Sequence, residues 1–335
     1  MRRLFVLAGM IAIFSLTLYA GSPAFAEEKE QQGKKEQGKV ETGIVAEKGG
    51  VLIGKGTLIF EPGLQYSHIS SQRLDITGFS VLPSLVFGIV QIEKIRRDIL
   101  VSSVTLKYGI INEIEVDVKV PHLLRYDNFT FGVPADRTEK RIDNSGLGDL
   151  EGALLVHIVK ETESRPDIIA SVKVKSRTGK SPYNISTETI NNNTVPMDLP
   201  LGSGHWAVEP GITIVRSADP AVIFGNLSYF NHIKRNVGYG FGEVDPSDSI
   251  NYSLGVAYAL SDKVALSSAF EQRFYNKTKI NGVKQPDTDI NTATLSFGTT
   301  YALHDRAALS FSIGIGLTPD SPDFQVSMRL PIRIF

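Results

Sequence analysis

The residues best suited to catalysis in this chain are Ser203, His205 and Asp198, which lie within one short stretch. Serine, histidine and aspartate are the residue types of a hydrolase triad, in which the histidine takes a proton from the serine nucleophile. The stretch is rich in polar residues, so the three types meet there by composition alone. We therefore expect no hydrolase site, and no enzymatic activity.

Metal and phosphate chemistry are also poorly supported. A first-row metal site needs two or three convergent ligands. Six histidines are present, none at H-x-x-x-H or similar spacing: His68, His122, His157, His205, His232 and His304. Residues 49–55 match the G-x-x-x-x-G-K pattern of a phosphate loop, but Gly56 stands where a serine or threonine is needed. The chain has no cysteine, which excludes thiolate ligands and disulfides. We expect no metal and no cofactor.

Composition and the N-terminal pattern suggest an exported protein. Of the 335 residues 42% are hydrophobic and 21% are charged, and the net charge of −1 gives no indication of nucleic-acid binding. Residues 1–26 combine an early arginine pair, an apolar run and a small-x-small ending at Ala26, which predicts a signal peptide. Residues 27–50 are rich in Glu, Lys, Gln and Gly, which predicts a disordered periplasmic tail. Residues 51–335 are predicted to form one folded domain.

Polar and apolar side chains alternate through that domain, most clearly from Asp323 to Phe335. A period of two is typical of a strand with two unlike faces. A lipid-facing side and a water-facing side account for both an apolar row and a row with two arginines. Twelve such stretches, joined by alternating short and long links, predict an all-β fold: a transmembrane antiparallel β-barrel in the bacterial outer membrane, surrounded by its lipids. The terminal Phe335 resembles the signal by which barrel-assembly machinery recognises such chains.

Charged side chains on the polar faces are predicted to point into the lumen. Because twelve strands enclose more space than side chains alone fill, we expect water there, with acidic and basic rows facing each other. The predicted pore-lining residues are Glu115, Asp117, Lys119, Glu151, His157, Lys173, Lys175, Arg177, Glu209, Glu271, Arg273, Arg329 and Arg333.

The segment 78–92 does not follow the alternation, because it is apolar on all sides. It is too short for a helical membrane span. Three interpretations stay open: two further strands, which would give fourteen; a segment on the outer lipid surface; or an apolar gate or binding wall in the mouth, which we favour. The residues of that gate are Phe79, Val81, Leu82, Leu85, Val86 and Phe87.

Three local motifs resemble a known family. They are Gly146–Glu151 (GLGDLE), Lys175–Gly179 (KSRTG) and Gly314–Phe324 (GIGLTPDSPDF). The family comprises outer-membrane, transporter-like barrels named for the meta-pathway of phenol degradation, and the resemblance covers roughly residues 98–335. Arg177 stands where that family usually has proline. The resemblance implies passive passage of small, aromatic or hydrophobic molecules as solutes. The alternative is an envelope scaffold or export pore whose tail, residues 27–50, docks a partner.

Overall fold

The computed structural model describes residues 52–71, 74–76, 79–81, 92–131, 138–190 and 193–335. The predicted signal peptide, 1–26, and the predicted tail, 27–50, lie outside the described residues. Within the described ranges, no helix is long and apolar enough to cross a membrane.

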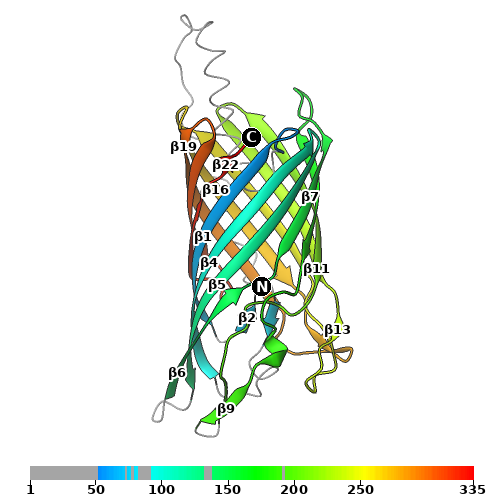
Figure 1. The fold of residues 1–335 in the computed structure, drawn as a ribbon, viewed down its shortest axis with the longest axis vertical. Helices are drawn as coiled ribbons and strands as arrows, with labels where there is room; N and C mark the ends of the chain where they lie inside the picture. Colours follow the sequence, from blue (N-terminus) through cyan, green and yellow to red (C-terminus); the bar gives the residue numbers. More distant parts are fainter. Residues whose placement is uncertain (1–51, 72–73, 77–78, 82–91, 132–137, 191–192) are drawn as a thin grey trace, which may run out of the picture. The chain divides into compact units, whose positions relative to one another are not determined.

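Fourteen strand segments of the described chain form one antiparallel sheet (Figure 1). They are β1 (Leu58–Ser71), β4 (Ile92–Ile111), β5 (Ile114–Phe131), β6 (Thr138–Leu147), β7 (Glu151–Val159), β8 (Asp167–Lys175), β11 (Ala207–Ala218), β12 (Ala221–His232), β15 (Ser249–Ala259), β16 (Val264–Tyr275), β19 (Ile290–His304), β20 (Ala307–Gly316), β21 (Phe324–Arg329) and β22 (Ile332–Arg333). β6 and β7 both pair with β5, and β21 and β22 both pair with β1. The segments therefore make twelve barrel strands, as the alternation predicts.

The barrel closes between its first and last strands. β1 pairs with β21 at Gly63 and Arg329, and with β22 at Ile59 and Arg333, in a single register. The break between β21 and β22 falls at Pro331, which lacks the backbone N–H that the ladder needs. Because β19 also pairs with β20, the barrel strands of the described chain form a closed ring.

The apolar segment contributes no strand to this sheet within the described residues. β2 (Leu74–Ile76) and β3 (Phe79–Val81) pair with each other in a separate two-stranded sheet. The fourteen-strand alternative is therefore wrong for the described chain. β4 begins at Ile92, earlier than the alternation indicates.

The two faces of the sheet differ as the sequence predicts. On β12, Ile223 and Leu227 are 54% and 58% exposed, whereas Asn226 and Ser228 between and beside them line an interior cavity. The same contrast separates Leu254, 61% exposed on β15, from its buried neighbour Ser253. An antiparallel barrel with an apolar outside and a polar inside is the architecture of outer-membrane proteins.

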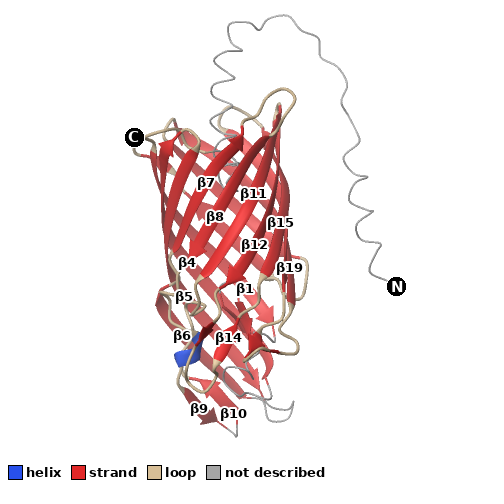
Figure 2. Ribbon diagram, turned by 90° about the vertical axis from the view of Figure 1, so that its right-hand side faces the viewer, coloured by secondary structure: helices blue, strands red, loops and turns tan. Residues whose placement is uncertain are grey.

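The connections define two unlike ends. Short turns join β4 to β5, β11 to β12, β15 to β16 and β19 to β20. The opposite end, away from the C-terminus, carries the longer connections (Figures 1 and 2). These hold η1 (Pro182–Asn184), β9 (Thr187–Ile190), β10 (Asn193–Pro196), β13 (Arg235–Asn236), β14 (Glu243–Asp245), β17 (Lys279–Ile280) and β18 (Val283–Lys284). Because long connections of such barrels face outward and short turns face the periplasm, we call these the outer and periplasmic ends.

Candidate functional site

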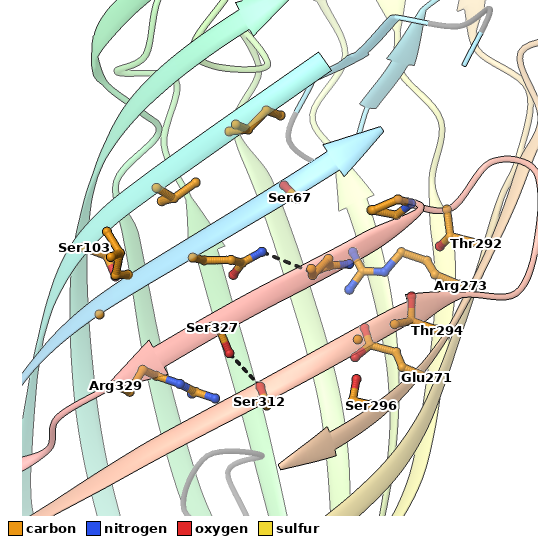
Figure 3. A pocket seen from close by; sticks show the side chains of 18 of the residues that line it. Ser67, Ser103, Glu271, Arg273, Thr292, Thr294, Ser296, Ser312, Ser327 and Arg329 are labelled. Atoms are coloured by element: carbon orange, nitrogen blue, oxygen red, sulfur yellow. Dashed lines mark hydrogen bonds between the residues drawn. The ribbon is translucent and has the colours of Figure 1, made fainter. Parts of the chain in front are cut away.

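A cavity of about 660 Å³ lies inside the barrel against β1, β4, β19, β20 and β21. Figure 3 shows its labelled side chains pointing into one common space. Eight serine and threonine side chains line it: Ser67, Ser103, Thr105, Thr292, Thr294, Ser296, Ser312 and Ser327. The Oγ atoms of Ser312 and Ser327 lie 2.7 Å apart, and Gln65 Nε2 donates to Gln325 Oε1 at 3.2 Å. This hydroxyl-lined cavity, called the chamber below, can both donate and accept hydrogen bonds.

Short side chains on one wall provide the space for the chamber. Gly63 on β1 and Gly314 on β20 both belong to its lining. A Cβ atom at Gly63 would lie 2.9 Å from Ser103 Oγ, and one at Gly314 would lie 3.1 Å from Thr294 Cγ2. Glycine inside a strand weakens the strand but permits close approach of a neighbour or ligand. The two glycines therefore leave space in the chamber and make this wall less stable.

Charged groups also line a second cavity of about 250 Å³, which has walls from β7, β8, β11, β12 and β15. Glu271 and Arg273 on β16 line both cavities. Arg273 Nη2 lies 3.5 Å from Glu209 Oε1, across the two strands between β16 and β11. Lys173 Nζ lies 3.5 Å from the other oxygen of Glu209. These three residues form a charged bridge along one side of the lumen, and Ser228 Oγ donates to it at 2.7 Å.

Other predicted pore-lining residues form local contacts at the inner wall. Lys119 and Glu151 lie 3.7 Å apart, and His157 lies 2.8 Å from Asp167. Arg329 lines the chamber, and Arg333 donates to Thr57 Oγ1 at 3.1 Å. Asp117 lies between Glu115 and Lys119 on β5, opposite Lys107 in the register. Arg177 lies beyond the end of β8 with an exposed side chain. The pore-lining role of all these residues stays a prediction.

Glu115 holds the segment that precedes β1. Its Oε2 accepts a hydrogen bond from Ile53 N at 2.8 Å, and its side chain is buried. Gly56 N donates to Gly109 O at 2.7 Å. A Cβ at Gly109 would meet Gly54 O at 2.3 Å, so only glycine allows this segment to lie so close. Residues 52–57 therefore pack against the inner wall at the periplasmic end.

Asp149 anchors a chain segment in the outer mouth. The segment, residues 199–205, includes Leu199 and Leu201, which are 0% and 4% exposed. Ser203 donates to Asp149 Oδ2 from both its backbone N and its Oγ, each at 2.9 Å. Gly179 N donates to Oδ1 at 3.0 Å, and Lys175 Nζ lies 3.1 Å from Oδ2. Asp149 thus links three parts of the chain at one carboxylate.

A second buried charge cluster lies beside this segment. Asp127 Oδ2 lies 3.1 Å from Arg97 Nε and 2.8 Å from Arg125 Nη2. All three side chains are at most 2% exposed, and Arg125 Nη1 also donates to Pro200 O at 3.0 Å. The sequence did not indicate this cluster, because its residues lie on two strands, β4 and β5, whose register the alternation does not fix. Asp149 entered only as part of the motif Gly146–Glu151. The alternation of Arg125, Asp127 and Phe129 with outward residues is the signal that could have found the cluster.

The structure separates the residues of the candidate triad. Ser203 Oγ bonds to Asp149 and Lys175, whereas the ring of His205 bonds to Tyr183 Oη at 3.2 Å and to Ile233 O at 3.1 Å. Asp198 pairs with Lys180. Burial lowers the pKa of His205 to about 4, so this histidine is neutral at pH 7. Each of these groups serves the packing of the outer mouth.

The predicted apolar gate lies only partly within the described residues, and the expected absence of a metal site can be examined only there. Phe79 and Val81 lie on β3, and Leu82, Leu85, Val86 and Phe87 lie outside the described residues. The proposed gate therefore stays a prediction. Within the described ranges, no group of three or more His, Asp or Glu side chains could hold a metal ion.

The closed barrel, its apolar exterior and its polar interior define an outer-membrane β-barrel with cavities in its lumen. Residues 123–334 match the family model described as "Putative MetA-pathway of phenol degradation". The chain belongs to this family, which confirms the resemblance of its motifs.

One solved structure shows the same fold, and two others are less similar. The COG4313 outer membrane channel from Pseudomonas putida F1 is 14% identical, with a TM-score of 0.60, and the match covers 85% of this chain and 97% of that one. The translocator domain of the autotransporter NalP from Neisseria meningitidis is 10% identical, with a TM-score of 0.47 and coverage of 91% and 94%. The toluene transporter TodX from P. putida is 9% identical, with a TM-score of 0.41 and coverage of 83% and 88%.

Proposed function

We propose that this protein is an outer-membrane channel for the passive passage of small molecules. The observation that carries the proposal is the chamber of about 660 Å³ inside the closed barrel. Pockets of about 300–1,000 Å³ are the usual size for small-molecule ligands. The similarity to a structure titled an outer membrane channel supports the same function.

The solute we propose is a small compound that combines an apolar body with a hydrogen-bonding group. The family description names phenol degradation, which favours an aromatic compound with a hydroxyl. The chamber offers Ser and Thr hydroxyls for that group, and Ile69, Ile99 and Ile290 for the apolar body. A site built to hydrogen-bond a hydroxyl discriminates against the analogue that lacks it, because its own polar groups are then left unpaired.

The charged bridge is proposed to set ion preference. The Lys173 side chain is 54% exposed although it pairs with Glu209, so its charge faces the water of the second cavity. Lys173→Glu would place two carboxylates together and should shift permeation towards cations. We also propose that Phe335 is recognised by barrel-assembly machinery, and its deletion should lower the yield of folded barrel.

Reconstitution tests the proposal. The purified barrel in planar bilayers should conduct ions. In liposomes it should raise the uptake of phenol, relative to protein-free liposomes, more than it raises the uptake of a larger sugar. Lys173→Glu should change the reversal potential in a salt gradient, while Lys263→Glu, in the short turn after β15, should not. A folded barrel that neither conducts nor admits any tested solute would refute the channel. Normal conductance together with loss of cellular function on deletion of 27–50 would support the docking alternative.

A further inference from the structure

Two arginines lie side by side on the outer face of the barrel, near its outer end. The register pairs Arg96 on β4 with Asn128 on β5, and Asn128 with Arg141 on β6. Both arginine side chains are exposed, whereas Arg97 and Ile142, next to them in the chain, are buried on the inner face. Strands lie about 4.8 Å apart, so the two arginine Cα atoms are separated by roughly 10 Å.

The level of this row relative to the membrane follows from the strand pattern. On β4 the exposed apolar residues Val104, Leu106, Tyr108 and Ile110 mark the lipid belt. Tyr126, 53% exposed, lies one row inward of the arginines, and exposed aromatic residues mark the membrane interface of such barrels. One row is two residues, or about 5 Å along the membrane normal for a strand tilted by about 40°. The arginines therefore lie at the level of the lipid headgroups.

Three carboxylates lie near this row on the outer face, but none of them is ion-paired with its arginines within the described residues. Neither Arg96 nor Arg141 forms an ion pair with a residue that the structure describes. Of the nearby carboxylates, Asp98 is held by Tyr66 Oη at 2.6 Å and by His68 at 2.8 Å. Glu139 accepts from Asn128 Nδ2 at 3.0 Å, and Asp143 lies beside Tyr126, one row inward. Two arginines in one cross-strand row, neither ion-paired within the described residues, favour an anion from outside the chain.

We propose that Arg96 and Arg141, on either side of Asn128, form a binding site for a phosphate on the headgroup of an outer-leaflet glycolipid. Arginine suits this ligand because its planar guanidinium can donate two parallel hydrogen bonds to phosphate oxygens. Two guanidinium groups about 10 Å apart at their Cα atoms can close on one phosphate between them. The lipid source follows from the position, since the row continues directly from the apolar belt.

Native mass spectrometry of the purified full-length barrel with added diphosphorylated lipid A tests the site. The unmodified protein should retain the lipid, and Arg96→Gln with Arg141→Gln should weaken retention by about ten-fold or more. Lipid A from which the phosphates have been removed should bind the unmodified protein and the variant equally. Arg96→Lys with Arg141→Lys should give intermediate retention, because lysine keeps the charge but loses the paired donors.

The matched control removes the same charge elsewhere. Arg165 and Arg306 are exposed in short turns at the periplasmic end, so replacing both with Gln should leave lipid A retention unchanged. Heat-modifiable migration on gels shows that each variant is folded. Equal retention by the outer and periplasmic variants would overturn the proposal, as would equal binding of phosphorylated and dephosphorylated lipid A. Displacement of lipid A by millimolar inorganic phosphate alone would also overturn it, because the site would then recognise the free anion.

Discussion

Asp149→Asn should release the segment 199–205 from the outer mouth. The substitution keeps the size of the side chain and removes its charge. Asp149 is 2% exposed and receives hydrogen bonds from Gly179 N, Ser203 N, Ser203 Oγ and Lys175 Nζ. An asparagine has one accepting oxygen, so its NH₂ group would face either the Gly179 N–H or the donors of Ser203 and Lys175.

The size of the effect follows from these contacts. A hydrogen bond to a charged group contributes about 1.5–3 kcal/mol, and breaking a buried ion pair by removing one partner costs about 3–5 kcal/mol. The contacts share one carboxylate, so their contributions do not add. We expect a loss of about 3–5 kcal/mol for docking of the segment, which is roughly a hundred-fold to several-thousand-fold change in its opening equilibrium.

Hydrogen exchange of residues 199–205, measured by mass spectrometry in lipid nanodiscs, reports this equilibrium directly. Asp198→Asn is the control, because Asp198 pairs with Lys180 where both side chains are at least one-third exposed and such pairs contribute about 0–1 kcal/mol. Faster exchange in Asp149→Asn, with little change in Asp198→Asn, is the expected result. Unchanged exchange in a folded Asp149→Asn barrel would refute the anchoring role.

Three further outcomes are expected. Phe311→Arg should destabilise the barrel by about 2–4 kcal/mol if the site lies at the membrane midplane. Ser296→Arg should destabilise it much less, because Ser296 faces the chamber. Urea unfolding in lipid measures both free energies, and equal losses would contradict the assignment of the two faces. The pKa of His205 in the folded state, about 4, lies below its value in the unfolded state, about 6.5. The stability that the neutral ring gives to the docked mouth segment is therefore complete above pH 6.5 and is lost as the pH falls towards 4. The protection of the mouth amides against hydrogen exchange, after correction for the intrinsic exchange rate at each pH, should therefore fall over that range, and His205→Gln should flatten the dependence. Gly109→Ala should displace residues 52–57, because its Cβ would meet Gly54 O at 2.3 Å. Trypsin should then cleave faster after Lys55. Gly152→Ala is the control, because its Cβ would have one contact, at 3.9 Å.

The barrel itself could be predicted because its two environments differ along every strand. Lipid outside and water or polar groups inside impose a period of two, and Ile223, Leu227 and Leu254 mark the lipid side as clearly in the sequence as in the structure. The alternation in β1 and the last strand also predicts which side of each strand faces the lumen, whereas the register that pairs Gly63 with Arg329 is seen only in the structure. Pro62 and Pro331 interrupt the ladder between those strands without changing which face each residue occupies.

The arrangement inside the barrel could not be predicted in the same way. Period two places Lys173, Glu209 and Arg273 on the inner wall, but the distances between strands that are not neighbours depend on closure and shear. The contact of Arg273 with Glu209 is of this kind. Buried apolar residues on the inner face, such as Phe129 and Ile169, are at odds with a simple polar lumen. Phe129 lies on β5, the strand that also carries Arg125. Arg125 donates a hydrogen bond to Pro200 O in the segment 199–205. No local pattern in the sequence indicates that this segment folds back into the outer mouth.

The pairing of β1 with β21 and β22 also determines when the molecule can finish folding. Gln65 meets Gln325 across 260 positions of the chain, and Leu58 N donates to Phe335 O at 3.0 Å. Contacts this distant in sequence form slowly, since the entropy of loop closure must be lost before they stabilise anything. Until they form, β1 and the last strand each present unpaired N–H and C=O groups on which other chains can aggregate. The protein therefore depends, between synthesis and insertion, on something that keeps these two strands from pairing elsewhere.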